Sequence, residues 1–226
     1  MRLLAILRSL WLSVRYARRL RIRHGEFSRY LRKSTNLALC YYGFSDSETM
    51  GQAEQAGRAA FLCCAYDVVT DWRGFDEEAF ETFRQILTRN APTELAALAI
   101  SLYQKECAGD LKDDGLERGV IALEFVTRMM ECRGHFRHGN YLRSAGRLLQ
   151  LVDDLLDYEE DSCTGDLNCL ASPRRREYLD QAEELASQTF LESLSFDPVL
   201  RYAIGLALAK ARTLRSEDQQ FLALTS

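Results

Sequence analysis

The sequence predicts a nearly all-α protein, and three observations lead to that prediction. Helix-forming residues dominate the 226-residue chain, only three prolines occur, and the alternation of β-branched residues that marks strands is scarce. Apolar residues make up 47% of the chain and charged residues 27%, which suits one compact domain with a substantial core. No apolar run reaches the roughly 18 residues that a transmembrane helix needs.

The first 33 residues differ in charge from the rest of the chain. They carry ten Lys and Arg residues against Glu26 alone, whereas residues 34–226 hold 19 basic and 32 acidic residues. The arginines alternate with Leu, Trp and Val in a basic amphipathic pattern, which separates residues 1–33 from a helical domain at 34–226. Such a helix either docks on the acidic body or makes peripheral contact with an anionic membrane surface. The acidic remainder would repel phosphates, which argues against a nucleic-acid partner.

The seven cysteines indicate reduced thiols. Their number is odd and none follows CxxC spacing, so a zinc ribbon and a disulfide framework are both disfavoured. We therefore expect a cytoplasmic protein.

Helical spacing and capping residues predict further helices along the chain. Thr49 and Asp76 stand where a helix would begin, and Pro92 suits a first helical turn. Residues 162–172 have loop chemistry and could form a lid. The last helix is largely apolar and is expected to be buried. In chain order we expect helices at residues 49–72, 76–90, 92–107, 116–131, 148–161, 174–194 and 198–214.

The helix at 148–161 carries the strongest functional signal. It places six acids in nine positions beside an apolar ladder. At about 100° per residue, one arc of about 100° holds four acids and Asp154 lies at its edge. A row of carboxylates repels itself unless a cation binds it. The four acids are Asp153, Asp157, Glu160 and Asp161, and the opposite side holds Leu148, Leu151, Val152, Leu155 and Leu156.

A second acidic pair lies on the helix at 49–72. Asp67 and Asp71 are four residues apart, and the same arc continues upstream through small residues. The small residues indicate space beside two carboxylates, although two solvated surface acids would show the same spacing. The stripe consists of Cys64, Ala60, Gly57, Ala56 and Ala53.

Two aspartate pairs on separate helices meet the requirements of a magnesium-diphosphate site. Mg²⁺ prefers oxygen ligands and is usually held by one or two carboxylates together with substrate phosphates. Helical bundles build metal sites from inward side chains on facing helices. The metal would neutralise charge on a departing diphosphate. The pairs are Asp67 with Asp71 and Asp157 with Asp161.

These motifs carry a family resemblance. The run from Gln150 to Asp161 resembles the second aspartate-rich motif of the squalene and phytoene synthase group of class I isoprenoid synthases, and Tyr66-Asp-Val-Val-Thr-Asp71 resembles the first. The chain is still more similar to tetraprenyl-β-curcumene synthase-like terpene synthases, whose second motif is D-Y-x-x-D-x-E-E-D followed by G-D-L-N. The matching residues are Asp153, Asp157, Glu159, Glu160, Asp161, Gly165, Asp166, Leu167 and Asn168.

The resemblance implies a single-domain, all-α isoprenoid synthase bundle with a central cavity. It also implies Mg²⁺ as cofactor and an all-trans prenyl diphosphate as substrate. We therefore expect a terpene synthase that ionises the substrate, releases diphosphate and forms a terpene by carbocation chemistry. Asp67, Asp71, Asp157 and Asp161 would be catalytic, and these four together with Asp153 would be the metal-side carboxylates.

Cations and aromatic side chains complete the expected site. Arg143, Arg147 and Lys105 are candidates for binding the diphosphate. Arg143 is expected to project toward the acidic arc, with Gly146 leaving space between them. Tyr66 and Phe61 are the main candidates for facing the carbocation, through cation-π attraction. Tyr41, Tyr42 and Phe125 are further aromatic candidates.

Three other functions fit the same residues. A squalene or phytoene synthase-like prenyltransferase would use the same motifs for condensation. An all-α nucleotide pyrophosphohydrolase also holds Mg²⁺ with acidic pairs on helices, although it favours ExxE spacing. A non-catalytic helical protein could use the acidic faces to bind partners.

Overall fold

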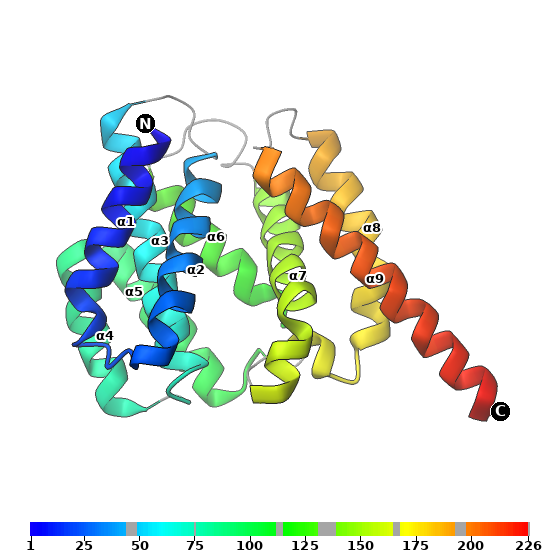
Figure 1. Ribbon diagram of the computed structural model, residues 1–226. Helices are drawn as coiled ribbons and strands as arrows, with labels where there is room; N and C mark the ends of the chain where they lie inside the picture. The colour runs from blue at the N-terminus through cyan, green and yellow to red at the C-terminus, as the bar shows by residue number, and fades with distance from the viewer. Residues whose placement is uncertain are drawn as a thin grey trace. The chain divides into compact units, whose positions relative to one another are not determined.

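The structure is a computed structural model, and every regular element in the part of the chain it describes is a helix, as predicted (Figure 1). It describes residues 1–43, 49–74, 76–111, 115–130, 139–164, 168–192 and 198–225. The helices are α1 (Arg2–Ala17), α2 (His24–Tyr42), α3 (Met50–Thr70), α4 (Glu77–Asn90), α5 (Thr93–Ala108), α6 (Glu117–Met129), α7 (Gly139–Thr164), α8 (Arg175–Glu192) and α9 (Pro198–Thr225), with a short 3₁₀ helix, η2 (Cys169–Ala171).

Two predicted helix starts are confirmed by their caps. The Thr49 hydroxyl accepts a hydrogen bond from the Gln52 backbone N–H at the start of α3. The Asp76 carboxylate accepts one from the Ala79 backbone N–H, at 2.7 Å, at the start of α4. These side chains satisfy backbone donors that the first helical turn leaves without a partner.

The packing of the helices divides the chain into two compact units. The first comprises Met1–Asp110 and Ile121–Arg137, and the second comprises Leu111–Val120 and His138–Ser226. The expected boundary at 33/34 falls inside α2, which continues through it. Residues 1–33 therefore belong to the same unit as α3, whose small side chains α1 covers.

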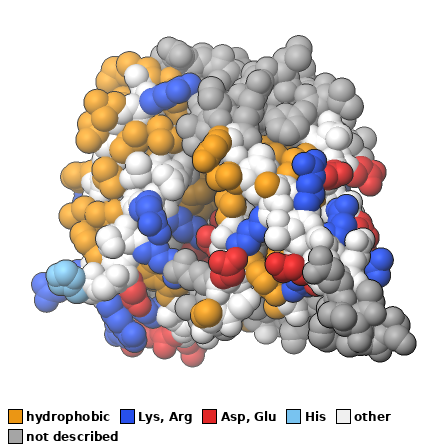
Figure 2. All heavy atoms as spheres, turned by 45° about the vertical axis from the view of Figure 1, so that its right-hand side comes forward, with side chains coloured by type: hydrophobic (Ala, Val, Ile, Leu, Met, Phe, Trp, Pro, Cys, Tyr) orange, Lys and Arg blue, Asp and Glu red, His pale blue; other side chains and the backbone are white. Residues whose placement is uncertain are grey.

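In the first unit, α1, α2 and α3 pack against one another, and α4 contacts α3 and α5 (Figure 1). Its core contains large, fully buried side chains: Leu12, Tyr30, Phe61, Leu62, Phe83, Ile86 and Leu87. The turn between α1 and α2 passes through Arg21, whose φ of 55° is left-handed. The exposed side of α1 also carries large apolar side chains, and Figure 2 shows hydrophobic side chains gathered at the left of its view.

In the second unit, α7 packs against α8 and α9, and η2 contacts α7 and α8. Leu116, Leu148, Leu151 and Tyr178 are fully buried there. The expectation that the last helix is buried is wrong for part of its surface. Tyr202 and Leu206 of α9 are exposed, because α9 packs through a single face of small and aliphatic residues, namely Ile204, Ala207, Ala211 and Leu214.

Among the described residues, no helix is both long enough and apolar enough to cross a membrane. Six cysteines in that part of the chain carry free thiols, and Cys64 and Cys169 are buried.

Candidate functional site

The predicted acidic row lies on α7, in the second unit. Asp153 is exposed, whereas Asp157 and Asp161 are half-buried. The side chain of Glu160 lies outside the described residues. The apolar side of the helix is buried as predicted at Leu148, Leu151, Val152 and Leu155. Leu156 is an exception: it is 39% exposed, and the Lys210 ammonium lies 3.4 Å from its carbonyl oxygen.

Asp161 has the most perturbed carboxyl group of the solvent-accessible part of this row. Burial raises its pKa to about 6, and the charges of Asp157, Asp154 and Asp153 raise it further, while a hydrogen bond from Asn168 opposes the shift. The Asn168 amide donates that bond to Asp161 Oδ2 at 2.9 Å. At Asp161, the charges of the neighbouring carboxylates therefore add to the effect of burial.

Asp154 was predicted to lie at the edge of the solvent-facing acidic arc, and this prediction is wrong. It is only 4% exposed, and its two oxygens accept hydrogen bonds from the Gln150 amide and the Cys169 backbone N–H, at 2.9 and 2.8 Å. Burial raises its pKa. The chain segment that begins at Asn168 covers it, which a helical wheel of residues 148–161 cannot reveal. Asp154 therefore anchors the following segment and is not open to a metal ion.

The segment predicted as a lid is fixed to α7 over its described part. Gly165, Asp166 and Leu167 of the sequence motif lie outside the described residues. Beyond them, Asn168 donates to the Asp154 carbonyl oxygen at 2.8 Å and caps η2 through Leu170 N–H. Leu170 is buried. Asn168 thus connects the acidic row to η2 through three hydrogen bonds.

The two candidate arginines of α7 lie beside other acids of the second unit. Arg143 is exposed and pairs with Glu117 at 3.4 Å. The pKa of Glu177 is lowered chiefly by its hydrogen bond from Arg174, with a smaller contribution from the charge of Arg147.

The prediction that Gly146 leaves open space between Arg143 and the acidic arc is wrong. A Cβ on Gly146 would lie 2.5 Å from the α-carbon of Val120, and one on Gly119 would lie 2.2 Å from the Gly146 carbonyl oxygen. The backbones of α6 and α7 therefore cross here at the closest approach that two glycines allow.

The other predicted pair, Asp67 and Asp71, lies at the C-terminal end of α3, in the first unit. The Lys33 ammonium of α2 lies 3.0 Å from Asp67 Oδ2, and both side chains are largely shielded from solvent. The Thr70 hydroxyl donates to Asp71 Oδ1 at 2.9 Å. Sequence reasoning missed Lys33, because only the packing of α2 on α3 brings it to Asp67.

A half-buried thiol, Cys63, and a buried phenol, Tyr41, adjoin the Lys33–Asp67 ion pair. Burial raises the pKa of Cys63 to about 12, and the charge of Asp67 adds to that effect, whereas the Tyr41 hydroxyl and Lys33 oppose it. Burial also raises the pKa of Tyr41 well above its ordinary value. Both groups are therefore neutral at physiological pH, so neither is an activated nucleophile.

The prediction that the small residues of α3 leave space beside the two carboxylates is wrong. Ala53, Ala56, Gly57, Ala60 and Cys64 are all buried. A Cβ on Gly57 would lie 2.5 Å from the Ala5 carbonyl oxygen and 2.7 Å from Arg8 Cβ. The stripe at Gly57 is therefore the contact surface for α1, and the small side chains permit close helix packing.

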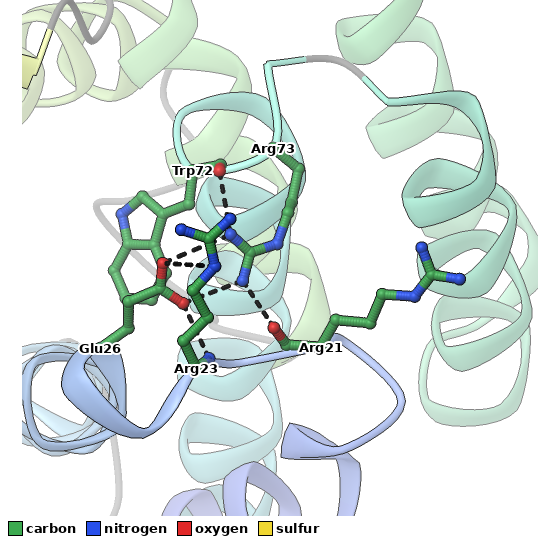
Figure 3. A network of polar contacts seen from close by, with 5 residues as sticks. All are labelled: Arg21, Arg23, Glu26, Trp72 and Arg73. Atoms are coloured by element: carbon green, nitrogen blue, oxygen red, sulfur yellow. Dashed lines mark hydrogen bonds and ion pairs between the residues drawn. The ribbon is translucent and has the colours of Figure 1, made fainter.

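A polar network holds the end of α3 beyond Asp71 (Figure 3). Arg73 pairs with Glu26 at 2.9 Å and donates to the Arg21 carbonyl oxygen at 2.6 Å and the Trp72 carbonyl oxygen at 3.0 Å. Glu26 also accepts from the Arg23 backbone N–H at 2.8 Å. The turn between α1 and α2 is thereby fixed to the chain that follows the first acidic pair.

The aromatic candidates of the first unit are mostly engaged in its core. The Phe61 ring stacks on Tyr16 with centroids 5.4 Å apart. Tyr66 packs edge-on against Phe83 and donates its hydroxyl hydrogen to Glu106. Tyr41, Tyr42 and Phe125 are also buried, whereas Lys105 on α5 is exposed.

The donors of α7 fit an open magnesium site better than a closed one. Within the described ranges, no three His, Cys, Asp or Glu side chains lie close enough together to hold a metal ion. Asp157 and Asp161 are one helical turn apart, and the pKa of Asp161 is raised chiefly by burial and further by the neighbouring carboxylates. One or two carboxylates suffice for Mg²⁺ when phosphates and water complete its octahedral shell.

The two predicted aspartate pairs fall in different units, Asp67 and Asp71 in the first and the α7 row in the second. In comparisons with protein-family models, with curated proteins and with solved structures, nothing matches this chain.

Proposed function

We propose that this chain is a Mg²⁺-dependent class I terpene synthase that ionises an all-trans prenyl diphosphate. The observation that supports it most is the carboxylate row of α7, in which the pKa of Asp161 is raised to about 6 by burial and by its acidic neighbours. Carboxylates that the fold holds close together despite their repulsion are stabilised when a divalent cation binds to them. The all-helical fold and the two aspartate-rich motifs agree with this proposal.

The residues of α7 would have separate roles in binding the metal and the diphosphate. Asp157 and Asp161 would hold Mg²⁺, with Asp153 at the exposed end of the row. The bound ion would supply charge neutralisation for the departing diphosphate. Asn168 would keep the Asp161 carboxylate in position through its 2.9 Å hydrogen bond. Arg143 and Arg147 would attract the diphosphate to the same helix.

In the first unit, Asp67, Asp71 and Lys33 would be the residues that bind metal and phosphate. Because Lys33 pairs with Asp67, that carboxylate would bind a metal ion only after the ion pair opens. The released ammonium would then be available to a phosphate oxygen, since Lys binds phosphate as a point charge. Phe61 and Tyr66 remain candidates for lining the path of the carbocation.

The test is incubation with Mg²⁺ and geranyl, farnesyl, geranylgeranyl and longer prenyl diphosphates, followed by extraction of products and measurement of released pyrophosphate. A terpene with the carbon number of its substrate supports the proposal. A product with the carbons of two substrates assigns the prenyltransferase reaction instead. Pyrophosphate release from nucleoside triphosphates assigns the pyrophosphohydrolase reaction, and no turnover on any substrate assigns a binding role.

The first mutational prediction concerns Asp157. Asp157→Asn removes a charge from the proposed ligand pair while preserving the size of the side chain, so kcat should fall by about a hundredfold or more. The control is Asp110→Asn, which neutralises an exposed carboxylate outside α7 and should retain the wild-type rate. A near-wild-type rate for Asp157→Asn would show that α7 does not hold the metal.

A further inference from the structure

The solvent-facing side of α1 is apolar, which is unusual for a surface helix. Leu3, Leu7, Trp11 and Val14 are 66%, 53%, 49% and 57% exposed. At 3.6 residues per turn these four positions form one stripe along the helix, about 16 Å long at 1.5 Å per residue. The opposite face, which packs on α2 and α3, consists mainly of small residues, namely Ala5, Ser9, Ser13 and Ala17.

The orientation of α1 is fixed by contacts on its buried face. The hydroxyl groups of Ser9 and Ser13 lie 2.5 and 2.8 Å from that of Ser34 on α2. Gly57 of α3 leaves no room between the helices for even one added carbon. Turning α1 to bury its leucines would break the serine hydrogen bonds and press large side chains against Gly57. The apolar stripe is therefore a stable part of the molecular surface.

Arginines border this stripe along its length. The guanidinium groups of Arg8 and Arg15 each lie 4.9 Å from the Trp11 ring centroid, on which they stack. Arg18 and Arg19 are exposed at the end of the helix, and no acidic residue precedes Glu26.

We propose that α1 is a docking surface for an anionic lipid bilayer. Leu3, Leu7, Trp11 and Val14 enter the boundary between headgroups and acyl chains, while the arginines remain at the lipid phosphates. Trp favours this boundary because its ring is amphipathic. This inference is independent of the proposed function.

Charge favours a bilayer over a second copy of the chain. Two copies joined through their α1 stripes would bring the arginine borders of both helices together, and like charges repel across an interface. Residues 34–226, with 19 basic against 32 acidic residues, are repelled by an anionic surface, so the bilayer favours approach by the α1 face alone. The apolar stripe and its basic border thus favour the orientation in which α1 faces the membrane.

The test is co-sedimentation of the full chain with phosphatidylcholine vesicles and with vesicles that also contain phosphatidylglycerol. We expect binding to the mixed vesicles, weak binding to the neutral ones, and loss of binding at high salt. A blue shift of tryptophan fluorescence on binding should be absent from Trp11→Phe, because the ring of the other tryptophan, Trp72, packs against Tyr30 and Arg29 of α2 and not in the α1 stripe.

Paired variants separate the stripe from general surface hydrophobicity. L7E/V14E should lower the partition coefficient at least about tenfold for each substitution, since each removes an apolar anchor. The control M50E/L206E adds the same charge at exposed apolar positions outside α1 and should bind within about twofold of wild type, because neither position belongs to the α1 stripe. R18Q/R19Q should weaken binding about fivefold for each arginine, whereas R89Q on α4 should not.

Three results would overturn the inference. They are failure to bind the mixed vesicles, equal loss of binding in the M50E/L206E control, and a dimer without vesicle binding that L7E/V14E dissociates in sedimentation velocity. The last result would assign the stripe to a second copy of the chain.

Discussion

Asp161 is the residue at which burial and mutual repulsion combine. Its folded-state pKa of about 6 exceeds the ordinary value of 3.8, so between these values the folded chain binds more protons than the unfolded chain. The free energy of unfolding therefore falls as the pH rises from about 4 to 6. Asp154, whose pKa is also raised by burial, contributes in the same direction.

Asp161→Asn should remove part of this loss of stability. The amide oxygen of the new side chain can still accept the Asn168 hydrogen bond, while the charge is gone. At pH 7 without metal, we expect the free energy of unfolding to rise by roughly 1 kcal/mol, with solvent screening limiting the effect of this half-buried group. Below about pH 4 the variant and the wild type should have equal stability.

Urea unfolding at a series of pH values would measure this difference. For Asp110→Asn, at an exposed position, the free energy of unfolding should show the same dependence on pH as that of the wild type. If Asp161→Asn is less stable than the wild type at pH 7, then the carboxylate is stabilised in the fold and the repulsive row does not exist.

At the scale of single residues, the sequence predicts which face of a helix is apolar but not what covers its edges. Asp153 and Asp157 lie on the accessible side of α7 as expected. Asp154 is buried because Asn168 and Cys169 fold back over it, and these residues are 14 and 15 positions further along the chain. Leu156 remains 39% exposed, although Lys210 of α9 reaches its carbonyl oxygen. Only long-range packing determines both outcomes.

At the scale of helices, glycine fixes two close crossings. Gly57→Ala should destabilise the protein by about 2 kcal/mol, because the new methyl group would overlap the backbone of α1 at Ala5. Gly51→Ala is the matched control on the same helix, since nothing lies within 4 Å of its Cβ position. That change should be neutral or stabilising by up to about 1 kcal/mol. Thermal unfolding of both variants measures the contrast, and equal stability would disprove the crossing.

Gly146→Ala provides the corresponding test in the second unit. Its methyl group would meet Val120 at the crossing of α6 and α7, so a loss of about 2 kcal/mol is expected. Gly205→Ala on α9 has open space around it and is the control. A stability of Gly146→Ala equal to that of this control would mean that α6 and α7 can separate at little cost.

Helix positions could be predicted because caps and apolar spacing are local signals. Thr49 and Asp76 begin α3 and α4 through hydrogen bonds to backbone three residues ahead. The small residues of α3 were misinterpreted for the opposite reason. Alanine and glycine accommodate either a cavity or a neighbouring helix, and only the position of α1 decides between them.

At the scale of the whole molecule, the sequence predicts the all-α class but not the division into two units. That division depends on which helices pack together, and α6 contributes residues to both units. The uneven charge is visible in the sequence, since ten of the 29 basic residues lie in the first 33 positions. The exposed stripe of α1 could be predicted only as an amphipathic pattern, because the pattern does not reveal which face is packed.

The response of the whole protein to Mg²⁺ and pyrophosphate is the last prediction. A ligand that binds only the folded state stabilises it by about 2.7 kcal/mol at a concentration of 100 Kd, which corresponds to a rise in Tm of roughly 5 °C or more for a chain of this size. The rise should shrink below about pH 6, because protonation of Asp161 competes with the metal. Asp157→Asn should abolish it, whereas Asp110→Asn should not. An equal rise in Tm with NaCl at matched ionic strength would show that salt screens the repulsion among the acidic residues in general. That result would contradict a specific metal site.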